Sequence, residues 1–303
     1  GDFPYHNDGG TFWNLTDDYE ARRRNNGARD RNVLFAWEDR SWRLRGEYLD
    51  QHREIPRRAP GNDRPGDPPG PELDTVRTSL GIGQEFSGER SWGWQAQVLR
   101  QDKEFFDPRD PRTLPAPQAT WNHHRTERFS LSTHRTQPLG RGSLTFAGEA
   151  FRESLRVEGD MVARYRLRSR YDQEVLNLAL EGSFPLGSRG RVVPSVRWNG
   201  VDGTGHLSWS LGAEWDLTGG WGAHLSYGRA FRAPTLYERF GDGALLLPRP
   251  NLRWEDGIQW DAGVRYEASM GKTRFRGSMT YFHRDVTDLI EFVMANAESA
   301  YYD

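Results

Sequence analysis

The sequence predicts an all-β protein whose antiparallel strands form part of a transmembrane β-barrel. First, many segments of about nine residues or more alternate strictly between apolar and polar side chains, which gives a sheet two unlike faces. Second, strands of that length cross a bilayer, whereas strands of soluble sheets cluster near five or six residues. Third, short turns and long loops alternate along the chain, which is the layout of an outer-membrane barrel.

Composition agrees with a sheet between lipid and water. The chain has 303 residues and a net charge of -2, so it lacks the basic excess of a nucleic-acid-binding protein. Only 35% of the residues are apolar, yet 12 are Trp, which favours a wet interior with an aromatic girdle outside. There is no cysteine, which excludes disulfides and thiolate metal sites. No apolar run approaches the roughly 18 residues of a membrane helix.

Alternation places the strands in order, and we expect about 12 to 14 of them. They are centred on 33–37, 42–48, 76–82, 92–98, 129–131, 144–148, 175–184, 192–198, 207–217, 223–227, 258–266, 275–281 and a last segment from about 289. The short turns fall at 38–41, 87–90, 137–142, 185–190, 218–220 and 270–272. Longer connections, at 55–74, 107–120, 158–170 and 232–257, fall at the opposite end, and 200–205 is a short connection there.

The alternating side chains predict which face meets which solvent. Trp209 and Trp215 alternate with Glu214 on one strand, and Trp260 precedes Asp261 on another. We expect the tryptophans to face hydrocarbon and the acids to face a hydrated lumen. Charges expected on the inner face are Arg77, Glu85, Glu149, Glu181, Glu214, Asp261 and Arg265. These residues either contact a plug or line a generic wet lumen.

Backbone groups in lipid have to be paired, so a membrane sheet has to close. About twelve strands could close a modest barrel by themselves. Because neither end carries a starting or closing signal, we expect residues 1–303 to be one barrel domain, truncated at both ends. The expected structure is a curved, unclosed wall or a small closed barrel.

The most informative stretch is 228–266, where two strands are joined by a long loop. Six residues of this loop and its strand ends stand out: Arg232, Pro234, Glu238, Asn251, Leu252 and Glu255. The charged residues could bind a ligand. We favour the alternative that they tie down the loop, because Pro234 and Pro250 fix the backbone beside them.

This stretch resembles the TonB-dependent outer-membrane receptors. In that family a strand ends in a sequence motif such as "aFRaPtl.Erf". The loop that follows leads into the next strand through a second motif, "NpnLk.E". The matching residues are Phe231, Arg232, Pro234, Thr235, Leu236, Tyr237, Glu238, Phe240, Asn251, Leu252, Glu255, Gly263 and Tyr266. A shorter pattern at 7–11, 17–18 and 24–25 is similar to an early hairpin of the cobalamin and siderophore receptor branch.

The resemblance implies a barrel of about 22 strands with an N-terminal plug domain, in the outer membrane of a Gram-negative bacterium. Such receptors import a scarce chelate, namely a ferric siderophore, haem or cobalamin, with energy passed through TonB. The implied partners are outer-membrane lipid, the plug domain, TonB and the small chelate, and no nucleic acid. The sequence departs from the family pattern because no plug precedes Gly1 and no closing strands follow Asp303. The alternative is a plug-less porin-like or structural barrel.

Residues for catalysis or metal binding do not form a recognisable set. His123 and His124 are adjacent on a strand, so their side chains point to opposite faces and cannot easily share an ion. No Ser/His/Asp arrangement or carboxylate pair is evident. We therefore expect no catalytic site, no metal site and no cofactor, and we rank an outer-membrane enzyme last.

Overall fold

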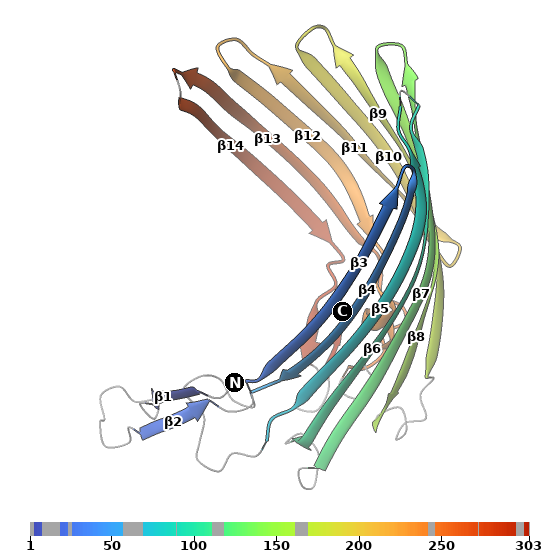
Figure 1. The fold of residues 1–303 in the computed structure, drawn as a ribbon, viewed down its shortest axis with the longest axis vertical. Coiled ribbons are helices and arrows are strands. Elements are labelled where there is room, and N and C mark those ends of the chain that lie inside the picture. Colours follow the sequence, from blue (N-terminus) through green and yellow to red (C-terminus); the bar gives the residue numbers. More distant parts are fainter. Residues whose placement is uncertain are drawn as a thin grey trace.

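The structure is a single antiparallel wall of strands (Figure 1). The computed structural model describes residues 3–7, 19–23, 26–56, 69–88, 90–110, 118–160, 169–241, 246–271, 273–294 and 300–302. The wall consists of β3 (Ala28–Asp39), β4 (Trp42–Glu54), β5 (Glu72–Phe86), β6 (Trp92–Asp110), β7 (Gln118–Leu139), β8 (Gly142–Gly159), β9 (Arg170–Leu186), β10 (Gly190–Val201), β11 (Thr204–Asp216), β12 (Trp221–Arg232), β13 (Glu255–Met270) and β14 (Thr273–Thr287). Two further pairs are β1 (Phe3–Asn7) with β2 (Tyr19–Arg23), and β15 (Phe292–Met294) with β16 (Ala300–Tyr302).

Every strand of the wall pairs with its neighbour in the sequence, so the topology is a simple up-and-down meander. The short turns lie at one end of the wall, seen at the top of Figure 1, as predicted. Gly140, Gly187 and Gly271 have φ between 60° and 68° in these turns, which is the left-handed region that favours glycine. At the other end, the loop between β12 and β13 carries the helix α2 (Leu236–Phe240). We call this end the mouth.

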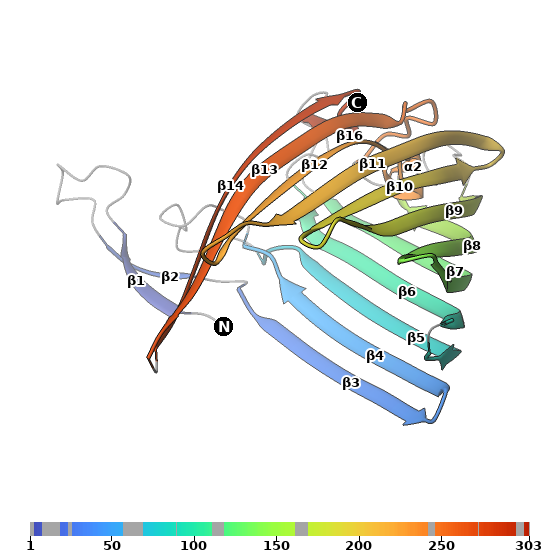
Figure 2. The ribbon, with the colours of Figure 1, turned by 90° about the horizontal axis from the view of Figure 1, so that it is seen from above.

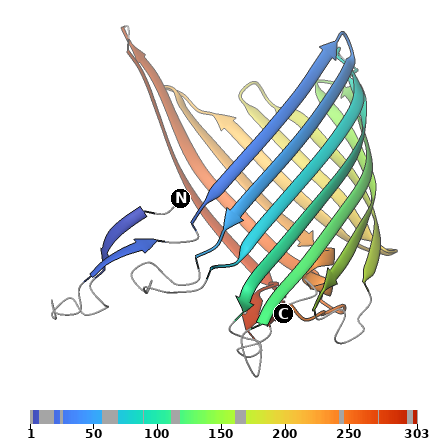
Figure 3. The same ribbon diagram turned by 60° about the horizontal axis from the view of Figure 1, so that its bottom comes forward.

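The wall is curved and does not close (Figure 2). Figure 3 shows that its strands run at a slant, as strands in barrels do. Among the described residues, β3 and β14 are each paired along one side only. The expectation of a curved, unclosed wall is thus confirmed. No helix in the described ranges combines the length and the apolar character that crossing a membrane would require.

Strand register fixes the two faces, because residues paired directly across a ladder point to the same side. Trp215 is aligned with Ala223, and Ala223 with Val264, on one face. Glu214 is aligned with His224, and His224 with Gly263, on the other. All seven predicted lumen charges share the face of Glu214, and the three tryptophans Trp209, Trp215 and Trp260 share the opposite face.

The position of α2 shows which face is concave. Leu236 of α2 packs against Leu155 and Val157 of β8, on the face that carries the charges. The loop that contains α2 starts at β12, four strands away from β8, where strands are about 4.8 Å apart. Only residues 233–235 separate β12 from α2, so the chain takes the straight path across the curve, and that path lies on the concave side. The charged face is therefore the inner face, and the tryptophans point outward as predicted.

Three local features differ from the sequence prediction. The helix α2 was not predicted, because five residues are too few to show a helical period. Strands β6 and β7 extend to Asp110 and from Gln118, into the expected loop 107–120, with a register shift after Asp107. The strand expected from about 289 begins at Phe292 as the three-residue β15, which pairs with β16 and not with the wall. Residues 8–18 and 24–25, which carry most of the hairpin pattern, lie outside the described residues.

An arginine introduced on the two faces of β11 should have opposite consequences. Leu211 faces outward, so Leu211→Arg should destabilise the protein in phospholipid vesicles by about 2–4 kcal/mol, the cost of placing Arg at the middle of a bilayer. The neighbouring Ser210→Arg is the matched control, because Ser210 faces inward beside Gly228. Urea unfolding in vesicles measures both. A larger loss for Ser210→Arg would contradict the assignment of faces.

Candidate functional site

Two hollows adjoin each other on the inner face of the wall. One, of about 460 Å³, includes Arg43, Glu85 and His134. The other, of about 340 Å³, includes Glu149 and Arg197 and shares Ser132 and His134 with the first. Polar and charged side chains thus form much of the inner surface here, which is suited to water and polar partners rather than to lipid.

A hydrogen bond between Glu85 and His134 lies in the first hollow. Glu85 Oε1 is 3.0 Å from His134 Nε2, and Arg43 Nη1 is 3.8 Å from Glu85 Oε2. Gly93 lies between them in the ladder, where a Cβ would come within 2.5 Å of Glu85 Oε2 and 2.8 Å of His134 Cε1. The glycine therefore leaves the space that lets this pair form.

Four of the other six predicted lumen charges have partners on the inner face. Arg77 Nη2 donates to Glu47 Oε1 at 2.6 Å, and Asn177 Nδ2 donates to Glu149 Oε2 at 3.1 Å. Asp261 accepts a hydrogen bond from Ser226 and lies 3.5 Å from His224, while Arg265 pairs with Asp216. Glu181 and Glu214 lie on the same face by register. The structure spreads these seven residues along the wall and does not gather them into one site.

At the mouth, the motif loop is held by one arginine. The Arg232 guanidinium donates two hydrogen bonds to Glu255, both of 2.6 Å, and two to Glu238, of 3.0 and 3.1 Å. Arg232 and Glu255 are direct cross-strand partners at the ends of β12 and β13. Glu255 Oε1 also accepts the Ile290 N–H at 3.0 Å, from the segment after β14. The mostly buried Glu255 therefore joins three segments.

Glu238 also caps the helix. Its Oε2 accepts the Thr235 N–H at 2.7 Å, and the Glu238 N–H donates to Thr235 Oγ1 at 3.2 Å. This reciprocal arrangement is a capping box, which satisfies N–H groups that a helix start leaves unpaired. The same carboxylate thereby starts α2 and binds Arg232.

The helix is docked on the inner face of β8 and β9. Leu236 is almost fully buried against Leu155 and Val157, and the ring of Phe240 stacks on Tyr171 with centroids 3.8 Å apart. His124, on the inner face of β7, contacts Tyr237 edge to face. His123, by contrast, bonds Asp102 on the outer face, so the two histidines are separated as predicted.

The remaining motif residues take different places. Pro234 is buried beside the helix start, Leu252 is partly buried, and Asn251 is exposed. Sequence reasoning missed Arg239, whose Nε donates to the Pro250 carbonyl at 3.3 Å and whose guanidinium lies 3.7 Å from Asp202 in the turn between β10 and β11. Gly241, which ends α2 with φ 73°, was a detectable signal, since helices commonly end at such a glycine.

The electrostatics of the mouth follow from these contacts. The hydrogen bond from Arg232 lowers the pKa of Glu255, and the Ile290 N–H adds to this effect, while burial opposes it. The pKa of Arg232 is raised, chiefly by its hydrogen bond with Glu255. Both groups lie beyond the outer apolar band, which ends at Tyr227 and Ile258 on these strands. Among the described residues, no three His, Cys, Asp or Glu side chains are grouped to hold a metal ion.

Comparison with known proteins places this architecture in a family. A family model described as "TonB dependent receptor-like, beta-barrel" matches residues 3–302. The structure is similar to that of the copper transporter OprC, with a TM-score of 0.69 and 16% identity over 90% of this chain and 48% of that chain. It is also similar to the hemophore receptor HasR of Serratia marcescens, solved as a double mutant with its hemophore HasA and heme, with a TM-score of 0.68 and 11% identity over 95% of this chain and 51% of that chain.

A third similar structure is the siderophore receptor PirA of Pseudomonas aeruginosa, with a TM-score of 0.58 and 16% identity over 91% of this chain and 56% of that chain. At these identities the structural likeness supports the fold alone. This chain spans about half the length of the solved structures that it matches. The family match, which covers nearly all of the sequence, goes further: this chain belongs to the TonB-dependent receptors, as part of their β-barrel.

Proposed function

We propose that this chain is part of the barrel wall of a receptor that imports a scarce chelate, namely a ferric siderophore, haem or cobalamin, with energy passed through TonB. Barrels of this family are outer-membrane proteins. The observation that carries the proposal is the pair of unlike faces, apolar outside and charged inside, with a folded loop docked at the mouth. A polar ligand would travel along the hydrated inner face.

The nature of the ligand is supported by the structural neighbours. They are a copper transporter, a hemophore receptor solved with its hemophore and heme, and a siderophore receptor. Each of these ligands is a metal, contains a metal or binds one. We therefore propose a small metal chelate, and we infer a transport role rather than a catalytic one because the family is one of transport receptors.

We propose that residues 1–303 act as one barrel domain and that the inner hollows receive a plug domain, with TonB as the energy-coupling partner and lipid around the outside. The hollows around Glu85 and Glu149 lie toward the short-turn end of the wall, away from the mouth. Their hydrogen-bonded side chains, His134 with Glu85 and Asn177 with Glu149, offer both donors and acceptors to a polar partner. Arg77, Glu181, Glu214, Asp261 and Arg265 extend this polar surface across the wall.

We further propose that Arg232, Glu238 and Glu255 position the mouth loop rather than bind the chelate. Their polar atoms are hydrogen-bonded to one another and to the N–H groups of Thr235 and Ile290, which leaves few donors or acceptors for a ligand. Pro234 and Leu252 would add packing to the same loop, and Asn251 is exposed on it.

Uptake assays test the proposed function. Deleting the gene from its bacterium should abolish energy-dependent accumulation of one of three probes: a ferric siderophore labelled with radioactive iron, haem or cobalamin. Restoring the gene should restore uptake, and dissipating the proton-motive force should block it. If deletion instead lowers the energy-independent entry of unrelated small solutes, the porin-like alternative replaces this proposal.

Replacing Arg232 should release the loop between β12 and β13 from the wall. Arg232→Met leaves Glu255 buried without its partner, at a cost of about 1–3 kcal/mol, so backbone amides of α2 should exchange about ten- to a hundredfold faster. Arg229→Met is the matched control, because Arg229 forms a similar two-bonded pair with Asp256 on the outer face of the same strands. Hydrogen exchange detected by mass spectrometry measures the exchange rate of the α2 amides in both variants. Equal effects of the two variants would contradict a positioning role for Arg232.

Acid should release the loop only below the ordinary pKa of a glutamate. Because the pKa of Glu255 is lowered in the folded state, its stabilising contribution is present above the unfolded value of 4.5 and is lost as the pH falls through the folded value. Protection of α2 amides, corrected for intrinsic exchange, should stay level between about pH 7 and 5 and then decline. In Glu255→Gln protection should start low and change less. If protection of the α2 amides in the wild-type protein declines around neutral pH, the proposed role of Glu255 is contradicted.

A further inference from the structure

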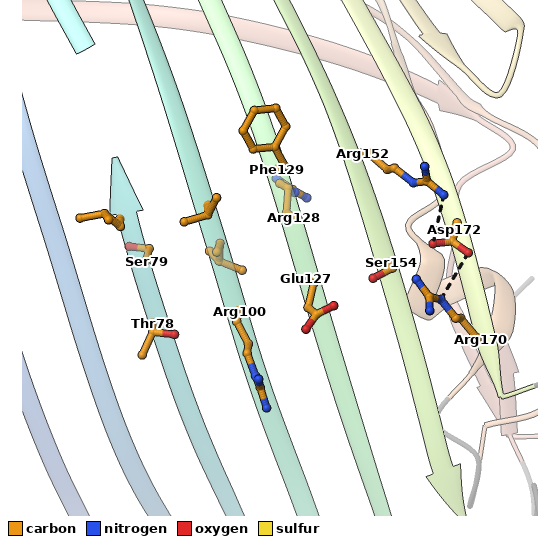
Figure 4. Close-up of a pocket in the computed structure, with 13 residues that line it drawn as sticks. Thr78, Ser79, Arg100, Glu127, Arg128, Phe129, Arg152, Ser154, Arg170 and Asp172 are labelled. Carbon is orange, nitrogen blue, oxygen red and sulfur yellow. Dashed lines mark ion pairs between the residues drawn. The ribbon is translucent and has the colours of Figure 1, made fainter. Parts of the chain in front are cut away.

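The outer face carries a groove of about 530 Å³ across strands β5 to β9 (Figure 4). One side is lined by the apolar residues Leu80, Val98 and Phe129, and the other by three arginines whose side chains face outward, Arg100, Arg152 and Arg170. A fourth lining arginine, Arg128, faces inward and donates to Glu153. Leu80, Val98, Phe129 and Arg152 are aligned in register, so their side chains share one face. That face is the outer one, because Leu80 is an odd number of residues from the inward-facing Arg77 on β5.

The groove lies where the outer face changes character. Along β6 the outward side chains pass from Trp94, Ala96 and Val98 to Arg100 and Asp102 toward the mouth. Along β7 they pass from Leu131 and Phe129 to Glu127 and Arg125 in the same direction. In a membrane barrel such a change marks the border between hydrocarbon and lipid headgroups. The groove is therefore placed at headgroup depth on the mouth side.

Within the part of the chain that the structure describes, two of these arginines form ion pairs but no close side-chain hydrogen bond to a carboxylate. Arg152 lies 3.9 Å from Asp172 and Arg170 lies 3.6 Å from it (Figure 4). Arg152 also lies 4.0 Å from Glu174, and all three distances exceed hydrogen-bond length. The two arginine side chains are 64% and 65% exposed. Among the described residues, Asp172 Oδ1 accepts no hydrogen bond although it is buried. By contrast, Arg229 on the same face donates two hydrogen bonds to Asp256 and so forms a fully hydrogen-bonded ion pair.

Both guanidinium groups lie within 4.0 Å of the same carboxylate, so they are close to each other. Guanidinium groups recognise phosphate through pairs of parallel N–H donors, and a phosphate offers several acceptor oxygens at once. Arg100 is already hydrogen-bonded to Asp102 at 2.9 Å, so among the outward-facing arginines that line the groove Arg152 and Arg170 are the two whose N–H donors are available to a phosphate. The cationic side thus complements a phosphate, and the apolar side complements hydrocarbon.

We propose that this groove binds a phosphate-bearing headgroup of a membrane lipid, with Arg152 and Arg170 on the phosphate and the acyl chains along Leu80, Val98 and Phe129. A soluble phosphate would use only the cationic side and leave the apolar side without a partner. A lipid satisfies both sides and holds the barrel at a fixed depth. This site is separate from the inner face and is independent of which chelate the receptor carries.

Native mass spectrometry of the protein purified from outer membranes in mild detergent tests the proposal. The probes are lipid A, which carries phosphate groups on an acylated glucosamine, the same lipid after dephosphorylation, and inorganic phosphate. Wild-type protein should bind lipid A, should bind the dephosphorylated lipid at least about tenfold more weakly, and should retain lipid A when inorganic phosphate is added at the same concentration. These comparisons need no variant.

Variants then assign the residues. Arg152→Gln with Arg170→Gln should weaken lipid A binding by about tenfold or more, and exposure of both side chains predicts unchanged folding. Arg191→Gln with Arg276→Gln removes the same charge from exposed positions on the inner face of β10 and β14, outside the hollows, and should leave lipid A binding unchanged. Equal loss in both pairs, equal binding of the dephosphorylated lipid, or displacement by inorganic phosphate would each overturn the lipid site.

Discussion

The structure depends on the pairing of backbone N–H and C=O groups between neighbouring strands. In hydrocarbon no water replaces a missing hydrogen bond, so strands that cross a membrane have to be long, continuous and paired along their length. The meander from β3 to β14 meets this requirement by joining each strand to the next in the sequence. Its two edge strands, β3 and β14, each have one unpaired side to which another strand could pair.

The same ladder also positions the mouth. Because Arg232 and Glu255 are direct cross-strand partners, the pairing of β12 with β13 brings both ends of the loop together. Glu238 then adds the helix start to that pair, and Leu236 and Phe240 dock the helix on β8 and β9. The mouth loop is thus an extension of the wall, held by a few charges at its base and by apolar packing at its helix.

The strands and the faces could be predicted because a period of two is visible in the sequence wherever the two solvents differ. Trp209 and Glu214 were assigned correctly to opposite faces for this reason. The extension of β6 past Asp107 could not be predicted, because Pro108 and Pro111 resemble loop residues and the ladder shifts its register there. The helix α2 is too short to show a period, although its capping residues Thr235 and Glu238 and its closing Gly241 were present in the sequence.

The sequence by itself determined which side chains share each face of the sheet, the order of the strands and the family, because these depend on the alternation of neighbouring residues and on a local motif. Only the tertiary structure decided which side chains meet: Glu255 with Ile290, Arg239 with Asp202, Phe240 with Tyr171. It also decided that Arg152 and Arg170 share Asp172 beside an apolar border. These contacts depend on strand register and on the curvature of the wall, which bring together residues far apart in the chain and leave no trace in local alternation.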